Sequence, residues 1–103
     1  YRQSMRHHGG VIVNITAGEA GGMPLMGHSG AARAGVHNLT ATAAVEWAAD
    51  GVRVNAVAPG YVASSGFDTY TDERMLRALH AFPGVTPVGR LGTEAEISAA
   101  VAF

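Results

Sequence analysis

The clearest pattern of apolar and polar positions lies between His8 and Gly60. After two glycines, residues 11–16 (VIVNIT) form a run rich in β-branched side chains, with little alternation between apolar and polar positions. Such a run is typical of a strand that is buried on both faces of a parallel sheet. A similar run covers residues 52–57 (VRVNAV), and residues 29–50 have helical spacing of apolar positions. The order strand, helix, strand predicts a crossover unit of a parallel sheet, and therefore an α/β fold.

The helix predicted over residues 29–50 is apolar on two sides. Ser29 is a suitable N-cap, and Asp50 followed by Gly51 is a suitable end. One apolar seam carries Val36, Leu39, Ala43 and Trp47, and a second seam of mostly small residues carries Ala34, Ala41, Val45 and Ala48. We therefore expect the helix to pack against neighbours on two sides.

Two loops are expected at the functional edge of this sheet. Residues 17–27 are rich in glycine and contain Pro24, and they are more numerous than the roughly two to six residues usual between a strand and a helix. Ligands of open parallel sheets bind beyond the carboxyl ends of the strands. This loop and the loop that starts at Pro59 are therefore expected to lie at the ligand-binding edge.

Beyond residue 60 the pattern predicts two shorter helices. Residues 71–81 are amphipathic, and residues 83–92 have the composition of a loop. Thr93 is expected to cap the last helix, with Glu96 completing a capping box.

Composition and charge narrow the class of protein. Of the 103 residues, 48% are hydrophobic and 15% are charged, and the formal net charge is −1, which is typical of a soluble globular protein of one domain at most. The charges are spread along the chain and form no basic patch for nucleic acid or a membrane surface. No apolar run approaches the roughly 20 residues of a membrane span, and no signal peptide is visible. A cytoplasmic location is expected.

The absence of cysteine excludes a disulfide framework, a thiolate metal site and a Cys nucleophile. The five histidines lack the spacing of a metal-binding motif, so no metal is expected. The chain starts at Tyr1 and stops at Phe103 within an apolar helical pattern. We therefore expect one partial domain, residues 1–103, that is truncated at both ends.

One short motif suggests a hydrolase. Residues 27–31 (GHSGA) resemble the G-x-S-x-G nucleophile elbow but fall one residue short of it, and they would make Ser29 the nucleophile of a serine hydrolase. Pro24 lies in the strand that this elbow requires, which disfavours the alternative. The sequence contains no G-x-G-x-x-G fingerprint for a phosphate-binding turn.

A more extensive pattern resembles the C-terminal half of a short-chain dehydrogenase/reductase, and it covers nearly the whole chain. The segments that carry the resemblance are residues 9–15 (GGVIVNI), 32–36 (ARAGV), 51–60 (GVRVNAVAPG) and 89–92 (GRLG). Residues 28–36 (HSGAARAGV) are most similar to the branch that contains peroxisomal trans-2-enoyl-CoA reductase and proteins similar to citronellol/citronellal dehydrogenase.

The resemblance implies a Rossmann-type, doubly wound parallel sheet, of which this chain is the C-terminal part. It further implies hydride transfer between NAD or NADP and a hydrophobic alcohol, carbonyl compound or enoyl thioester, the last as an acyl-CoA. Assembly into a homodimer or homotetramer through the helix at residues 29–50 is also implied.

The sequence departs from the family at the residues that move protons. The family's Tyr-x-x-x-Lys falls on Ser29 and Arg33, and its catalytic Ser falls on Ala17, next to Thr16. The resemblance thus assigns Ser29, Arg33 and Thr16 to the catalytic positions, although an unperturbed alcohol such as Ser29 is a poor acid. A non-catalytic homologue that binds the cofactor is therefore an alternative. Further candidates for proton transfer are Glu19, His28, His37 and Tyr61.

The resemblance also assigns cofactor contacts and a substrate lid. Arg33 can keep part of the Lys role as a cation that hydrogen-bonds ribose hydroxyls, although it cannot lose a proton. The residues that match the family's P-G-x-V and the Thr after it are Pro59, Gly60, Val62 and Ser64. Residues 65–83 fall where the family varies its lid, and an apolar pocket wall for an acyl or terpenoid chain is expected from Tyr61, Phe67, Tyr70, Met75, Leu76 and Leu79. The alternative is a helix that packs on its own domain.

Overall fold

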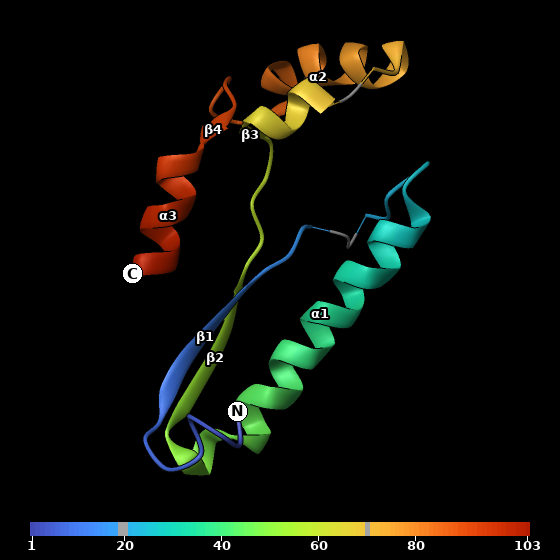
Figure 1. Ribbon diagram of the computed structural model, residues 1–103. Coiled ribbons are helices and arrows are strands. Elements are labelled where there is room, and N and C mark those ends of the chain that lie inside the picture. Colours follow the sequence, from blue (N-terminus) through green and yellow to red (C-terminus); the bar gives the residue numbers. More distant parts are fainter. Residues whose placement is uncertain (19–20, 70) are drawn as a thin grey trace. The chain divides into compact units, whose positions relative to one another are not determined.

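The computed structural model describes residues 1–18, 21–69 and 71–103. The chain divides into two compact units, Tyr1–Pro59 and Gly60–Phe103 (Figure 1). The predictions made for Glu19 and Tyr70 lie outside the described residues.

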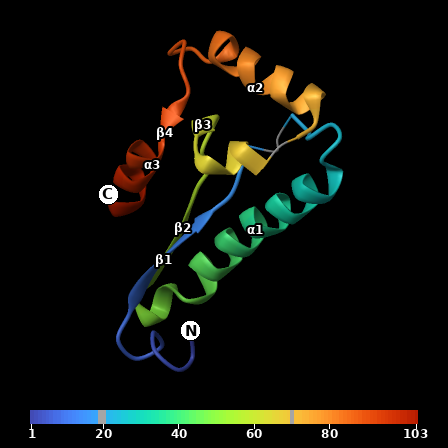
Figure 2. The ribbon, with the colours of Figure 1, turned by 45° about the horizontal axis from the view of Figure 1, so that its top comes forward.

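The first unit is the predicted strand–helix–strand crossover. Strand β1 (Gly10–Ile15) leads through a loop into helix α1 (Gly27–Glu46), the short 3-10 helix η1 (Ala48–Asp50) and strand β2 (Val52–Val57). The strands pair in parallel, from Gly10 opposite Val52 to Ile15 opposite Val57. Helix α1 runs alongside both strands (Figures 1 and 2). An α/β fold with parallel strands is therefore confirmed.

The core of this unit lies between α1 and the strands. Ala43, Val52 and Val54 are buried at its centre, and the partly buried side chains packed against them are Tyr1, Met5, Ile12, Ala44 and Trp47. The residues that face this core from α1 and its C-cap follow one stripe, Val36, Thr40, Ala43 and Trp47. The second predicted seam is exposed along its length, at Ala34, Ala41, Val45 and Ala48.

Leu39, which was expected in the seam with Val36 and Ala43, is instead 60% exposed, and Thr40 takes the place in the core. The reason is a polar link that apolar patterning does not show. The Thr40 hydroxyl accepts a bond of 2.9 Å from the Asn14 amide on β1 and donates one of 2.8 Å to the Val36 carbonyl. Because both polar side chains are satisfied, they can occupy the interface between strand and helix.

Both predicted ends of α1 are wrong. The N-cap is Met26 and not Ser29. A turn closed by a hydrogen bond of 3.0 Å from the Met26 N–H to the Met23 carbonyl comes directly before the helix, so the helix starts earlier than predicted. The predicted end at Asp50 is also wrong for the α-helix, which ends at Glu46, and the separate 3-10 helix η1 is the element that ends at Asp50, with Gly51 as its C-cap. Gly51 has a φ of 70°, which glycine adopts without strain.

The second unit contains strand β3 (Val62–Ala63), the 3-10 helix η2 (Ser65–Thr69), helix α2 (Glu73–Val85), strand β4 (Gly92–Thr93) and helix α3 (Glu94–Ala102). Strands β3 and β4 pair in parallel, with Val62 opposite Gly92. The predicted end of α2 at residue 81 is wrong, because the helix continues through Pro83. Proline keeps a helical φ and lacks only one N–H donor, and α2 ends two residues after it.

The predicted capping box of the last helix is confirmed. The Thr93 hydroxyl accepts from the Glu96 N–H at 3.2 Å, and the Glu96 carboxylate accepts from the Thr93 N–H at 2.8 Å. Arg90, which the sequence did not indicate, adds two bonds to the same carboxylate, of 2.7 and 3.1 Å. In the described part of the chain, no helix is both long enough and apolar enough to cross a membrane.

Replacing Thr40 with Val tests the link between β1 and α1. The substitution keeps the shape but leaves the Asn14 amide without its acceptor, so we expect a loss of about 1–3 kcal/mol in the free energy of unfolding. Thr42→Val, at an exposed position of the same helix, is the matched control and should change that free energy by less than about 0.5 kcal/mol. Urea denaturation of the protein that carries this chain measures both values, and equal losses would contradict the assignment.

The Glu96 carboxylate should make the stability of the second unit depend on pH. Hydrogen bonds from Arg90 and from Thr93 lower the pKa of Glu96 from 4.5 to about 2. Because the folded pKa lies below the ordinary one, the stabilisation is complete above about pH 4.5 and is lost as the pH falls toward 2. We expect Glu96→Gln to lower the thermal midpoint at pH 6 and to do so less at pH 3. Glu94→Gln, in the same helical turn, is the control, and a pH-independent effect of Glu96→Gln would refute the assignment.

Candidate functional site

The candidate site of the first unit begins where β1 ends. Thr16 follows the last residue of β1, and its N–H donates to the Val57 carbonyl at 2.9 Å, which extends the ladder between the strands by one bond. Its side chain is buried, and its hydroxyl donates to the Arg33 carbonyl of α1 at 3.3 Å. Thr16 therefore connects the carboxyl end of β1 to the second turn of the helix.

Arg33 makes the return connection. Its guanidinium donates to the Ile15 carbonyl, the last of β1, over 3.1 Å. A guanidinium has five N–H donors, and the bond to the strand uses one of them. Arg33 is half-buried, and its charge is held at the carboxyl edge of the sheet.

Ser29 lies one helical turn before Arg33, on the same face of α1. Both residues are half-buried, whereas the intervening Ala31 and Ala32 are exposed. The structure thus joins Thr16 and Arg33 directly and places Ser29 on the helix face that carries Arg33. A turn, and not a strand, precedes Ser29 at residues 23–26, which does not fit a nucleophile elbow.

The two histidines of α1 are both exposed. His28 is the second residue of the helix, and His37 follows Ser29 by two turns. Groups of three or more His, Cys, Asp or Glu side chains that could hold a metal ion are not found within residues 1–18, 21–69 and 71–103.

The predicted cofactor contacts beyond Pro59 lie at the start of the second unit. Val62 belongs to β3, and the Gly92 N–H donates to the neighbouring Tyr61 carbonyl at 2.8 Å. Ser64 follows β3, and its carbonyl accepts from the Phe67 N–H at 3.1 Å. The pairing of β3 with β4 therefore fixes both ends of the segment between residues 64 and 91.

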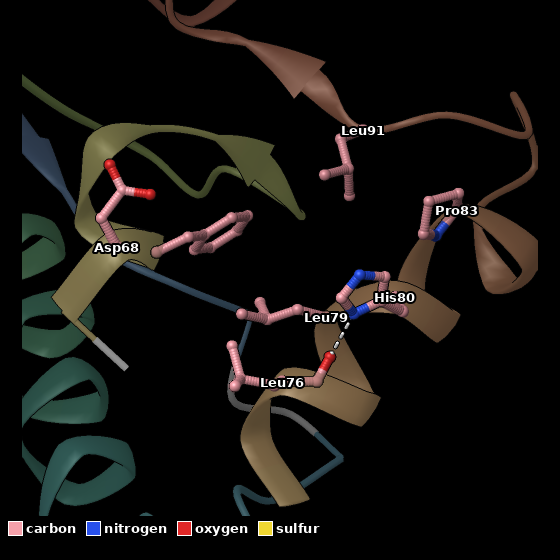
Figure 3. Close-up of a pocket in the computed structure, with 7 residues that line it drawn as sticks. Asp68, Leu76, Leu79, His80, Pro83 and Leu91 are labelled. Carbon is pink, nitrogen blue, oxygen red and sulfur yellow. Dashed lines mark hydrogen bonds between the residues drawn. The ribbon is translucent and has the colours of Figure 1, made fainter. Parts of the chain in front are cut away.

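Described residues of this segment line an open pocket of about 390 Å³ (Figure 3). Its lining consists of Phe67, Asp68, Leu76, Leu79, His80, Pro83 and Leu91. Three residues of the expected apolar wall are present, namely Phe67, Leu76 and Leu79.

The structure corrects the expected wall at two positions and adds polar residues that the sequence reasoning missed. Tyr61 lies outside this lining, because its ring stacks on Phe82 with 3.8 Å between centroids and 12° between planes. Met75 also lies outside it. His80 was missed, although its position four residues after Leu76 could have indicated it, since a helical side chain can reach the carbonyl one turn back. The His80 Nδ1 and the Leu76 carbonyl oxygen are 2.7 Å apart.

The whole chain is similar to parts of known oxidoreductases. The family model described as enoyl-(acyl carrier protein) reductase matches residues 1–103. A peroxisomal 2,4-dienoyl-CoA reductase from Mus musculus is 40% identical over 105 residues, which cover 100% of this chain and 35% of the relative.

Two solved structures from Pseudomonas aeruginosa PAO1 are also similar to this chain. One is a citronellol catabolism dehydrogenase, with 52% identity and a TM-score of 0.75 over 99% of this chain and 37% of that protein. The other, a short-chain oxidoreductase described as containing an atypical catalytic center, has 35% identity and a TM-score of 0.73 over 90% of this chain and 39% of its own. The chain therefore spans between 35% and 39% of the length of these proteins. The similarity confirms that its parallel α/β unit is part of a Rossmann-like fold.

Proposed function

Because this chain belongs to the short-chain dehydrogenase/reductase family, we propose that the protein carrying it is an oxidoreductase that uses NAD or NADP. Its proposed substrate is a hydrophobic alcohol, a carbonyl compound or an enoyl thioester. The observation that carries the proposal is the reciprocal link between Thr16 and Arg33. It holds a guanidinium, which has five N–H donors, at the carboxyl end of β1, the edge at which open parallel sheets bind ligands.

The residues present fit a nicotinamide nucleotide in part. When bound, the cofactor gives or accepts the hydride. The Arg33 guanidinium has five N–H donors and bonds to Ile15 with one of them, and such donors suit ribose hydroxyls. Pro59, Gly60, Val62 and Ser64 are the other proposed contacts, and the hydrogen bond between Tyr61 and Gly92 braces the backbone next to Val62. This support would keep the β3 backbone in place when a ligand contacts it.

The residues at the end of β1 and the start of α1 fit proton transfer less well than they fit cofactor binding. A guanidinium stays protonated, so Arg33 binds and orients but does not relay a proton. The Thr16 hydroxyl directs its proton at the Arg33 carbonyl, and we assign it to positioning that helical turn. Ser29 is left as the hydroxyl that would hold or pass the proton. A similar structure is described as a short-chain oxidoreductase with an atypical catalytic center, which supports the view that departures from the usual residues occur in this family.

A second candidate function is a homologue that binds the cofactor without catalysis. The specific observation in its favour is that both side chains linked at the end of β1, Thr16 and Arg33, are held in structural bonds to backbone carbonyls. In this case the site would keep its affinity for the nucleotide and lack a group that moves the proton.

The names of two relatives support the proposed substrate class. One is a dienoyl-CoA reductase and the other a citronellol catabolism dehydrogenase, and the pocket of the second unit has apolar walls that would suit the chain of either kind of substrate. The expectation of a single partial domain stays a prediction. The cytoplasmic location is also untested, and one relative is described as peroxisomal.

Variants at Ser29 and Arg33 of the protein carrying this chain test the proposal. We expect Arg33→Met to weaken binding of NADH or NADPH, measured by titration calorimetry, about tenfold or more, the loss expected for a charge-assisted bond. Ser29→Ala should keep that affinity and lower kcat about 100-fold, the lower end of the usual effect of a proton-transfer group. Arg53→Met, at an exposed site on β2, is the control and should change neither quantity.

Three outcomes would contradict the proposal. Unchanged cofactor affinity in Arg33→Met would remove Arg33 from the site. A wild-type protein that binds cofactor and turns over neither enoyl-CoA nor citronellal, but gains activity with Ser29→Tyr and Arg33→Lys together, would establish the non-catalytic homologue. Labelling of Ser29 by a fluorophosphonate would favour the serine hydrolase.

We also propose that α1 is the interface of a homodimer or homotetramer. Its face away from the core carries large apolar side chains that are exposed, with Leu39 at 60% and Val45 at 79%. Val45→Glu should therefore reduce the mass measured by light scattering to that of a smaller species, because it places a charge in the proposed interface. Glu46→Gln on the same helix is the control, and an unchanged mass in Val45→Glu would refute this interface.

A further inference from the structure

The pocket of the second unit has an unusual distribution of polar groups. Most of its lining is apolar, and among the lining residues that the structure describes only Asp68 and His80 carry titratable side chains. Figure 3 shows Asp68 on the η2 side of the pocket and His80 on the α2 side. The volume of about 390 Å³ falls within the roughly 300–1,000 Å³ of small-molecule sites.

The hydrogen bond of His80 determines which ring nitrogen carries the proton. The Leu76 carbonyl, 2.7 Å from Nδ1, can only accept, so Nδ1 must carry the hydrogen. In the neutral ring Nε2 then has no hydrogen and is an acceptor. Figure 3 shows Nε2 on the side of the ring that faces Leu91, across the pocket. The helix therefore presents an acceptor among apolar side chains.

This arrangement selects one ligand chemistry. The Asp68 carboxylate and the neutral His80 Nε2 both accept hydrogen bonds, and the lining contains neither Lys nor Arg. Both side chains are exposed at the rim of the pocket. A carboxylate or phosphate beside Asp68 would meet a like charge, and a ketone or aldehyde would find no donor on these two side chains. A hydroxyl group can donate to either acceptor, while the apolar body of the molecule is covered by Phe67, Leu76 and Leu79.

We propose that this pocket binds an apolar alcohol whose hydroxyl donates to Nε2 of His80, which makes His80 a residue that determines specificity. The inference rests on the proposed function, and among its three substrate classes it selects the alcohol over the carbonyl compound and the thioester. His80 binds and orients the alcohol before the reaction. On oxidation the hydride would pass to the oxidised cofactor and the hydroxyl proton to the proton-transfer group of the proposed function, so the hydrogen bond to Nε2 is lost when the carbonyl product forms.

The affinities of three ligands that each have eight carbon atoms, but different polar groups, test the inference. The ligands are 1-octanol, 2-octanone and octanoate, and their affinities for the protein carrying this chain are measured by titration at pH 8, where free imidazole is neutral. We expect 1-octanol to bind about five- to tenfold more tightly than 2-octanone, the effect of one net hydrogen bond, and octanoate to bind most weakly.

Variants then assign the preference to His80. His80→Phe should remove the advantage of 1-octanol over 2-octanone, and His80→Gln should restore part of it, because the amide oxygen is an acceptor. Leu79→Ala should weaken 1-octanol and 2-octanone to a similar extent, and His7→Phe, at an exposed site outside the pocket, should change nothing. In steady-state assays His80→Phe should raise KM for the alcohol and leave kcat nearly unchanged.

Several results would overturn the inference. The inference is wrong if 1-octanol does not bind, or if octanoate binds most tightly of the three ligands. It is also wrong if His80→Phe changes the affinities for the alcohol and the ketone equally. A fall in kcat without a change in affinity would equally reject a role in specificity. Binding of NADH and NADPH is measured on the same samples. If 1-octanol is preferred and His80→Phe removes that preference, but neither cofactor binds, the proposed function alone is rejected. If cofactor binding and turnover are normal but His80→Phe does not change the preference for the alcohol, the inference alone is rejected.

Discussion

Two parallel strands cannot be joined by a tight turn, and the first unit is organised by this constraint. The chain must return from the end of β1 to the start of β2, and α1 with its flanking turns covers that distance. Close packing of the helix on the strands places Ala43 against Val52 and Val54 in the core. The same crossover brings α1 past the carboxyl end of β1, which is where Arg33 and Thr16 meet. The candidate site is thus a direct consequence of the parallel connection.

The features that follow from short sequence patterns were predictable. The bounds of β2, the end of η1 at Asp50–Gly51 and the capping box of Thr93 and Glu96 each depend on a few adjacent residues with strong local preferences. The wrong predictions involve competition between local and tertiary preferences. Ser29 is a good N-cap by residue type, but the turn at Met23–Met26 starts the helix earlier. Thr40 replaces Leu39 in the core because Asn14 supplies a polar partner from another element.

In the candidate site, too, some features follow from the sequence and others depend on contacts in space. The assignment of Ser29, Arg33 and Thr16 from family resemblance stays a prediction. The resemblance did not show that Arg33 turns back onto the Ile15 carbonyl, because the direction of a long side chain depends on its neighbours in space. His80 in the pocket lining was also missed, because the spacing of apolar residues gives no information about a histidine that hydrogen-bonds to a carbonyl of its own helix. Arg90 stabilises the capping box from outside the helix, and a local motif does not include such a partner.

The side chains at positions 29 and 33 determine how the proposed reaction could proceed. Ser29 and Arg33 stand where the family resemblance implies a tyrosine and a lysine, and Arg33 retains a fixed charge with donors for a ligand while giving up proton exchange. The account therefore depends on whether Arg33 contacts the nucleotide. The most direct test is nitrogen-15 NMR of the side-chain N–H groups of arginine in the protein carrying this chain, before and after addition of NADH or NADPH. We expect the Arg33 resonance to shift on binding while that of Arg53 stays in place. An unchanged Arg33 resonance in a protein that demonstrably binds the cofactor would contradict the account.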